Sequence, residues 1–226
     1  MKTPFLLTVL AVVGTSPQVL AQQSEIRLGG TMLSTHRNVA IDSMNPSRLN
    51  GTTSSAEFVA RSKNAGIMFR YSQATFSPNL SVSGYQSLNV ADGRLLLGPQ
   101  VFAIEVGYMR RSQSSKLFED PGEHLALAGA RSVIDLGPSG FSISFAGQAI
   151  GRVEKDTTII NPSSGKVRIA GWSLETGLIY QAPRKLPFFG MLAYRFDRYR
   201  LPPKDGARRE ESSSIVVGGG LRFATF

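Results

Sequence analysis

The sequence offers few side chains that could act as a nucleophile, a general base or a metal ligand. Its 226 residues include no cysteine and two histidines, which excludes thiol nucleophiles, disulfide scaffolds and cysteine-ligated zinc. His124 lies close to Asp120 and Glu123 in the chain. His36 follows Ser34 by two residues. A histidine oriented by a carboxylate can act as a general base, but no second carboxylate pair with matching spacing is present. We therefore predict no catalytic residue, no metal site and no cofactor.

Charged side chains alternate with apolar ones along several segments. In segment 101–111, Glu105 and Arg111 have one parity, whereas Phe102 and Tyr108 have the other. Because side chains alternate between the two faces of a strand, such a segment has a charged face and an apolar face. Six arginines and five acids have the polar parity of their segments: Arg27, Glu57, Arg61, Arg70, Asp92, Arg94, Glu105, Arg111, Glu175, Arg195 and Asp197.

All of these charges lie in segments with the two-residue periodicity of strands, which are separated by clusters of Gly, Pro, Ser and Asn. We predict ten strands, at 25–35, 55–61, 65–75, 86–97, 101–111, 123–136, 141–152, 166–181, 186–199 and 213–225. The second has an alternative, because Ser54 and Glu57 match a capping box and Ala56 to Asn64 could form a short helix. The sixth does not keep a clean alternation, and a bulge within it is expected.

Short and long connections alternate between the predicted strands. Tight turns are expected at 62–64, 98–100, 137–140 and 182–185, and long polar loops at 36–54, 76–85, 112–122, 153–165 and 200–212. In an antiparallel sheet, this alternation places every tight turn and both chain ends at one rim. A closed barrel with both ends at one rim has an even number of strands. We therefore predict ten strands, with eight as the alternative if the helix forms and the first segment is a plug.

The first 21 residues have the features of a secretory signal. Lys2 is followed by an apolar stretch over 5–13, and Val19 to Ala21 resembles a cleavage site. We expect cleavage after Ala21 and a single barrel domain over 22–226. With 42% hydrophobic and 18% charged residues, the composition excludes a disordered chain, and no segment has the roughly 20 apolar residues of a membrane-spanning helix.

The loop alternation, the even strand number and the final Phe226 together resemble bacterial outer-membrane β-barrels. The resemblance implies an all-β, antiparallel up-and-down transmembrane barrel in the outer membrane of a Gram-negative-type bacterium. It implies outer-membrane lipids, lipopolysaccharide and the outer-membrane assembly machinery as partners. The sequence departs from the family pattern at its end, because Phe223 and Leu221 have the opposite parity from Phe226.

In a membrane barrel the apolar parity faces lipid, and aromatic residues gather at the two interfaces. The sequence predicts one aromatic belt next to the tight turns, at Phe102, Phe141, Tyr180 and Phe188, and another near the long loops, at Tyr71, Tyr108 and Phe196. The eleven charges then face the lumen, where we expect them to pair, since an uncompensated charge in a narrow interior is unfavourable. Their pairing predicts either a charged constriction in a narrow pore or a filled, closed barrel.

The expected function is that of a non-enzymatic structural or surface-interaction barrel or a narrow pore. One alternative is an outer-membrane enzyme, either a lipid A-modifying hydrolase or an omptin-like protease. Omptins are ten-stranded barrels with acids and a histidine near the external rim, and in this sequence Asp42 lies near His36. Another is a soluble secreted ligand-binding barrel with its apolar residues inside. The long-loop rim carries basic residues, including Arg37, Arg200 and Arg209, interleaved with acids such as Glu210. These could pair with lipid phosphates or be solvated.

Nucleic-acid binding is not expected. The formal net charge is +9, but the chain has no run of basic residues with stacking aromatic residues between them. The sequence does not predict an oligomeric state.

Overall fold

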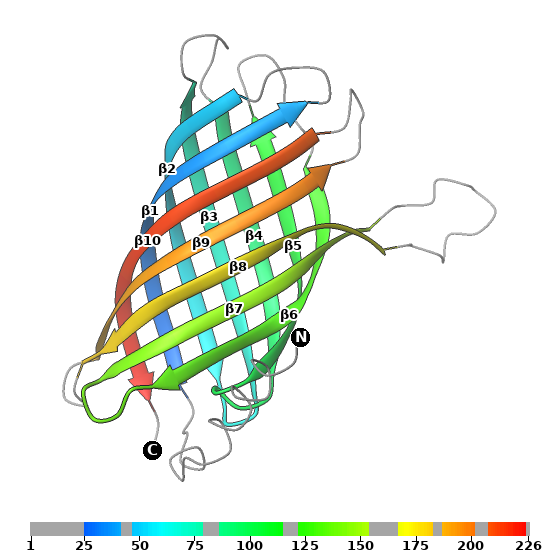
Figure 1. The fold of residues 1–226 in the computed structure, drawn as a ribbon. Coiled ribbons are helices and arrows are strands. Elements are labelled where there is room, and N and C mark those ends of the chain that lie inside the picture. The colour runs from blue at the N-terminus through cyan, green and yellow to red at the C-terminus, as the bar shows by residue number, and fades with distance from the viewer. Residues whose placement is uncertain are drawn as a thin grey trace, which may run out of the picture.

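The computed structural model describes residues 25–41, 47–78, 86–114, 122–153, 167–182, 187–201 and 208–224. Within these ranges lie ten strands: β1 (Glu25–Ile41), β2 (Ser47–Arg61), β3 (Ala65–Pro78), β4 (Gln86–Leu97), β5 (Ala103–Ser114), β6 (Glu123–Asp135), β7 (Phe141–Val153), β8 (Val167–Gln181), β9 (Phe188–Leu201) and β10 (Arg208–Ala224). Each pairs antiparallel with its neighbours in the chain, and β1 pairs with β10 to close the barrel (Figure 1). The prediction of a ten-stranded, all-β, up-and-down barrel is confirmed, and the eight-stranded alternative is wrong.

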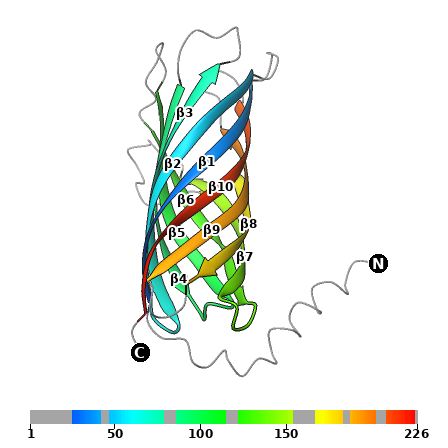
Figure 2. The ribbon, with the colours of Figure 1, turned by 90° about the vertical axis from the view of Figure 1, so that its left-hand side faces the viewer.

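The tight turns lie together at one end of the barrel, below the strands in Figure 1. Residues 62–64, 98–102 and 136–140 connect strands there, and Glu25 pairs with Ala224 at the same end. Gly137 and Gly140 have φ angles of 84° and 77°, which are favourable for glycine and allow the chain to reverse. We call this the turn end and the opposite one the loop end. The strands tilt across the barrel axis between the two (Figure 2).

The first two strands are much longer than predicted. β1 continues to Ile41 and β2 begins at Ser47, so most of the predicted loop over 36–54 is strand. The added residues of β1 pair with β10, ending with Ile41 opposite Arg208. Many of these residues are polar, so they lack the apolar alternation that identifies a strand. The short helix considered over Ala56 to Asn64 is also wrong, because most of this segment is part of β2.

The predicted bulge in the sixth strand is wrong. β6 pairs with both neighbours without a register shift, and Leu125 and Leu127 lie on its inner face with Arg131. A register shift instead occurs between β7 and β8, where Ala170 has no partner between the pairs Ile150–Gly171 and Gly151–Ile169. The fifth strand also begins two residues later than predicted, so Phe102 belongs to the turn that precedes it.

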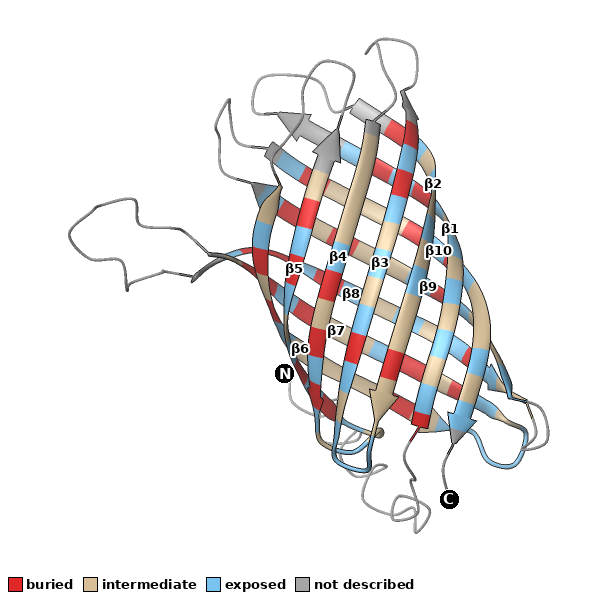
Figure 3. Ribbon diagram, turned by 180° about the vertical axis from the view of Figure 1, so that it is seen from behind, coloured by how far each residue is buried: buried red, intermediate tan, exposed pale blue. Residues whose placement is uncertain are grey.

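The wall of the barrel is apolar outside and mixed inside. Exposure alternates along the strands, as the bands of colour in Figure 3 show. Large apolar side chains such as Phe69, Ile104 and Leu192 are about half exposed on the outer surface. Buried apolar residues form small clusters within the bore, one of which contains Met109 and Tyr199. No helix in the described ranges is long and apolar enough to cross a membrane.

Candidate functional site inside the barrel

A layer of buried ion pairs crosses the interior in the half of the barrel nearer the turn end. Glu105, on β5, is only 1% exposed and accepts hydrogen bonds from Arg94 Nη1 at 3.2 Å, from Arg131 Nε at 2.6 Å and from the Gln148 side chain. Asp92 accepts from Arg94 Nε at 2.8 Å and, through its other oxygen, from Arg70 Nε at 3.1 Å. Both carboxylates are thus held by two guanidinium groups: those that bind Glu105 come from the two neighbouring strands, and those that bind Asp92 come from β3 and from β4 itself.

One pair of this layer spans the bore. Arg70 Nη1 lies 3.7 Å from Glu175 Oε2, and Arg131 Nη1 lies 3.5 Å from Glu175 Oε1. Arg70 is on β3 and Glu175 is on β8, which are five positions apart around the ring of ten strands and therefore face each other across it. We call the six residues the ion-pair layer: Arg70, Asp92, Arg94, Glu105, Arg131 and Glu175. Three arginines and three acids make the layer formally neutral.

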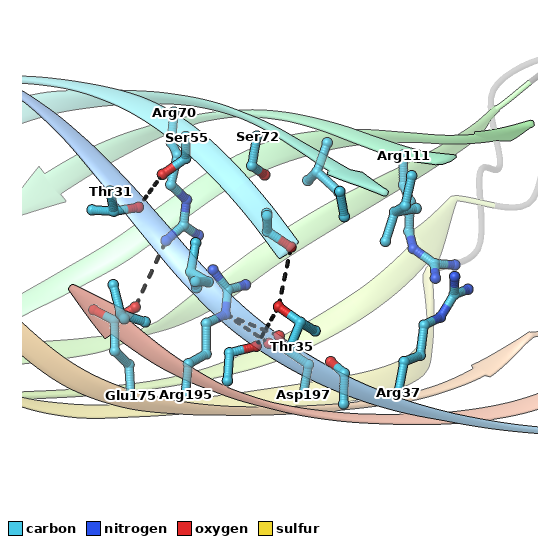
Figure 4. A pocket seen from close by; sticks show the side chains of 18 of the residues that line it. Thr31, Thr35, Arg37, Ser55, Arg70, Ser72, Arg111, Glu175, Arg195 and Asp197 are labelled. Carbon is cyan, nitrogen blue, oxygen red and sulfur yellow. Dashed lines mark hydrogen bonds and ion pairs between the residues drawn. The ribbon is translucent and has the colours of Figure 1, made fainter. Parts of the chain in front are cut away.

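A second ion-pair bridge crosses the bore nearer the loop end. Glu210 accepts from Arg37 Nη2 at 2.7 Å and from Arg111, whose Nη1 also lies 3.6 Å from Glu123. Arg111 is on β5 and Glu210 on β10, again strands that face each other. Arg37 and Arg111 reach toward one another in Figure 4, and we call the set Arg37, Arg111 and Glu210 the upper bridge. Arg37 and Glu210 are therefore interior residues, and their prediction as rim charges is wrong.

Aromatic rings support both arginines of the upper bridge. The guanidinium carbon of Arg37 lies 5.3 Å from the ring centre of Phe76, and that of Arg111 lies 4.9 Å from the ring centre of Tyr199. A guanidinium over an aromatic face gains a cation–π interaction in addition to its ion pair. The bridge is thus fixed by contacts at both of its arginines.

Between the ion-pair layer and the upper bridge lies a chamber of about 90 Å³ (Figure 4). Seven serine and threonine side chains line it: Thr31, Thr35, Thr53, Ser55, Ser72, Ser212 and Ser214. Ser214 donates to Thr35 at 3.2 Å, and Thr35 lies 3.1 Å from Thr53, so the hydroxyls of β10, β1 and β2 form a chain along the wall. Arg195 and Asp197 pair at 2.9 Å on β9, the strand next to β10, without crossing the bore. The chamber is polar and large enough for several water molecules.

A smaller cavity of about 20 Å³ lies between the ion-pair layer and the turn end. It shares Glu57, Glu175 and Met191 with the chamber, so these residues stand between the two cavities. Arg27 and Arg61 line it on the turn side. Arg27 pairs with Glu25 at 2.6 Å, and Arg61 donates to the Gly98 carbonyl at 2.6 Å. All eleven charges predicted for the lumen are thus buried or line one of these two cavities.

The residues that sequence reasoning missed lie in the same network. Glu25 and Glu210 are more buried than their partners Arg27 and Arg111, and Arg131 is about as buried as Glu175. Arg131 has the same parity as Leu125 and Leu127, so its inward position could not be recognised from alternation. The inner face of β6 is apolar near the loop end and charged nearer the turn end. Glu25 and Glu210 lie close to strand ends, where alternation is hard to detect.

The predicted aromatic residues lie on the outer surface. Six are exposed there, namely Tyr71, Phe102, Tyr108, Phe141, Tyr180 and Phe188, and Phe196 is partly covered by Trp172 with ring centres 5.1 Å apart. Phe141 and Tyr180 contact each other near the turn end at 5.0 Å. Trp172, which was not among the predicted aromatic residues, is the counterpart of Tyr180 on β8 at the loop end.

Neither histidine lies in an arrangement suited to catalysis among the described residues. His36 Nδ1 contacts Asn50 Oδ1 at 2.7 Å on the outer surface, and His124 contacts the Tyr108 hydroxyl there. Glu123 pairs with Arg111 in the interior, on the other side of the wall from His124. Ser34 is exposed on the face that carries His36. The acids considered as their partners, at positions 42 and 120, lie outside the described residues.

Comparison with known proteins gives similarity in structure only. No protein-family model and no curated protein sequence matches the chain. The translocator domain of autotransporter NalP from Neisseria meningitidis is 11% identical, with a TM-score of 0.46 over 97% of this chain and 95% of that one. Neisserial surface protein A is 12% identical, with a TM-score of 0.40 over 88% and 97%. The attachment invasion locus protein Ail of Yersinia pestis is 12% identical, with a TM-score of 0.34 over 89% and 100%. These are small bacterial outer-membrane β-barrels, the class that the sequence resembles.

Proposed function

We propose that the protein is an integral outer-membrane barrel with a closed interior, which acts as a structural or surface-interaction protein and not as an enzyme or an open pore. The observation that carries this proposal is that ion pairs between facing strands cross the bore at two levels, Arg70 to Glu175 and Arg111 to Glu210. The lipid-facing character of the outer wall supports its location.

The spacing of the outward aromatic residues matches a membrane. Trp172 and Tyr180 on β8, like Phe188 and Phe196 on β9, are eight residues apart. At a rise of about 3.3 Å per residue this is roughly 26 Å along the strand. A strand tilt of about 35–45° converts this to roughly 19–22 Å along the barrel axis, close to the apolar band of about 25 Å in outer-membrane barrels. Apolar residues such as Leu192 fill the wall between the belts.

The ion pairs of the interior block the bore. Each bridge joins strands on opposite sides of the ring, so an ion that moved along the axis would have to displace a paired guanidinium and carboxylate. Both partners are well buried: the side chains of Arg111 and Glu210 are 5% and 2% exposed. Separating such a pair leaves an uncompensated buried charge, which is strongly unfavourable. The chamber between the bridges therefore holds water without a continuous path for solutes.

Planar-bilayer recording of the refolded protein tests this proposal. We expect no discrete conductance steps for the wild type. A variant with Arg70→Ala, Glu175→Ala, Arg111→Ala and Glu210→Ala removes both bridges with no change in net charge, and we expect it to conduct.

The matched control removes two other ion pairs that do not cross the bore. Arg195→Ala with Asp197→Ala removes a pair within β9, and Arg209→Ala with Glu211→Ala removes one on the outer surface. We expect this variant to remain silent. Discrete conductance steps in the wild type would show an open pore and contradict the closed interior. Failure of the wild type to insert into bilayers would contradict the membrane location.

A further inference from the structure

A cluster of arginines lies on the outer surface just beyond the aromatic belt of the loop end. Arg198 and Arg200 alternate outward on β9, and Arg209 lies outward on β10. Arg198 is two residues beyond Phe196 on the same strand face and is paired in register with Trp172 of β8. We call Arg198, Arg200 and Arg209 the arginine cluster. In a membrane, these side chains would lie at the level of the lipid headgroups.

The cluster has an excess of positive charge. Arg200 and Arg209 are directly opposite each other in the β9–β10 register, and Arg198 is directly opposite Glu211. Glu211 Oε1 receives Arg209 Nη2 at 2.8 Å and lies 3.3 Å from Arg198 Nε. One carboxylate oxygen thus serves two guanidinium groups. Three arginines and one glutamate leave a net charge of +2.

The position of Arg200 is the most informative. It is exposed, and within the described part of the chain it makes no ion pair. Side chains directly opposite on one face of an antiparallel pair have Cβ atoms about 4.5–5.5 Å apart, and like charges there are destabilising. An anion that binds both Arg200 and Arg209 would compensate this repulsion between their directly opposed side chains.

We propose that Arg200 and Arg209, with Arg198 beside them, bind a phosphate group of the outer-leaflet glycolipid. Guanidinium groups bind phosphate oxygens in a bidentate manner, so two opposed arginines can hold one phosphate between them. The aromatic pair Trp172 and Phe196 lies directly below, where it can contact the sugar and upper acyl region of the same lipid. This inference rests on the membrane location proposed above.

On β5, which faces β10 across the barrel, the described residues offer a single outward arginine at this level. Arg110 of β5 is also exposed two residues beyond an outward aromatic residue, Tyr108, but the residue opposite it in register is His124. It therefore provides a single arginine at a comparable level of the wall. Arg110 is the natural control for general attraction between a basic rim and an anionic lipid.

Thermal unfolding in octyl glucoside micelles, titrated with diphosphorylated lipid A, tests the inference. A ligand that binds the folded state stabilises it by an amount that grows with the logarithm of the ligand concentration divided by its dissociation constant, so the dependence of the unfolding temperature on lipid A concentration gives that constant. We expect Arg200→Gln with Arg209→Gln to weaken binding by about a hundredfold, that is about tenfold for each charge-assisted contact. We expect Arg110→Gln to change it by less than about threefold. Without lipid, the double variant should be at least as stable as the wild type, because it removes a like-charge pair.

Three results would overturn the inference. The first is equal weakening by the cluster variant and by Arg110→Gln, which would indicate only general attraction. The second is equal binding of lipid A from which the phosphates have been removed, and the third is the same stabilisation by inorganic phosphate alone. Insertion of the wild type into phosphatidylcholine vesicles is measured in parallel by the heat-dependent shift in gel mobility. If insertion occurs and lipid A binding does not depend on the cluster, the inference is wrong while the proposed function stands, whereas failure to insert overturns both.

Discussion

The ion-pair layer predicts a large loss of stability when Glu105 is replaced. Its carboxylate accepts three hydrogen bonds, from Arg94, Arg131 and Gln148, and is 1% exposed. Hydrogen bonds to charged groups contribute roughly 1.5–3 kcal/mol each, so three would give about 4.5–9 kcal/mol. Glu105→Ala leaves Arg94 with Asp92 and Arg131 with Glu175, however, so part of the pairing remains. We therefore expect a loss of about 3–5 kcal/mol, the usual effect of removing one partner from a buried pair.

Urea unfolding of the refolded protein in phosphatidylcholine vesicles, followed by tryptophan fluorescence, measures this loss. The single tryptophan, Trp172, lies on the outer surface of β8 and changes its surroundings when the barrel leaves the membrane. Glu211→Ala is the matched control, because Glu211 also receives two arginines but is 32% exposed. We expect it to lose less than about 1 kcal/mol, as surface ion pairs do.

A third variant separates charge compensation from loss of packing. Replacing Glu105 together with Arg131 by alanine removes one anion and one cation, and Arg94 retains Asp92. If the uncompensated charge dominates, this double variant is more stable than Glu105→Ala despite the larger deletion. Equal losses for Glu105→Ala and Glu211→Ala would refute the reasoning, because they would show that the interior is as well solvated as the surface.

Further predictions concern the outer wall and the effect of salt. Leu192→Arg places a charge between the aromatic belts and should cost about 2–4 kcal/mol, whereas Ile169→Arg, beyond the belt at the loop end, should cost about 0–1 kcal/mol in the same urea assay. Equal costs would contradict the placement of the membrane. Raising the salt concentration to about 1 M shortens the screening length to about 3 Å, and we expect it to leave the effect of Glu105→Ala unchanged because its partners are buried. A strong decrease of that effect would indicate that salt enters the interior.

The strand number and the turn end could be predicted because they depend on local sequence. Turns such as 62–64 and 136–140 are marked by small and polar residues between segments of two-residue periodicity, and each strand pairs with the next one in the chain. The extensions of β1 and β2 could not be recognised in the same way. Beyond the aromatic belt both faces of a strand can be polar, so His36 and Asn38 give no apolar alternation although they pair with β10.

The interior contacts could be predicted only in part. Parity alone assigns Glu105 and Arg111 to one face of β5, and the structure has both on the inner wall. Parity does not show which charges meet, because that depends on how far apart the strands are around the closed ring. The contacts of Arg70 with Glu175 and of Arg111 with Glu210 join residues 105 and 99 positions apart in the chain. The sixth strand was misinterpreted for a related reason: an inner face can be apolar at one level, as at Leu125, and charged at another.

The ion-pair layer and the upper bridge lie one after the other along the bore. This arrangement allows a test that distinguishes a closed interior from a barrel that is merely destabilised. Arg70→Ala with Glu175→Ala leaves the upper bridge in place, and Arg111→Ala with Glu210→Ala leaves the ion-pair layer. Since either obstruction alone blocks the path, we expect both double variants to be silent in planar bilayers and only their combination to conduct. A barrel that merely became unstable would instead show conductance that grows with each substitution. Conductance in the Arg111 and Glu210 variant alone would show that the ion-pair layer does not close the bore, and would place the barrier at the upper bridge only.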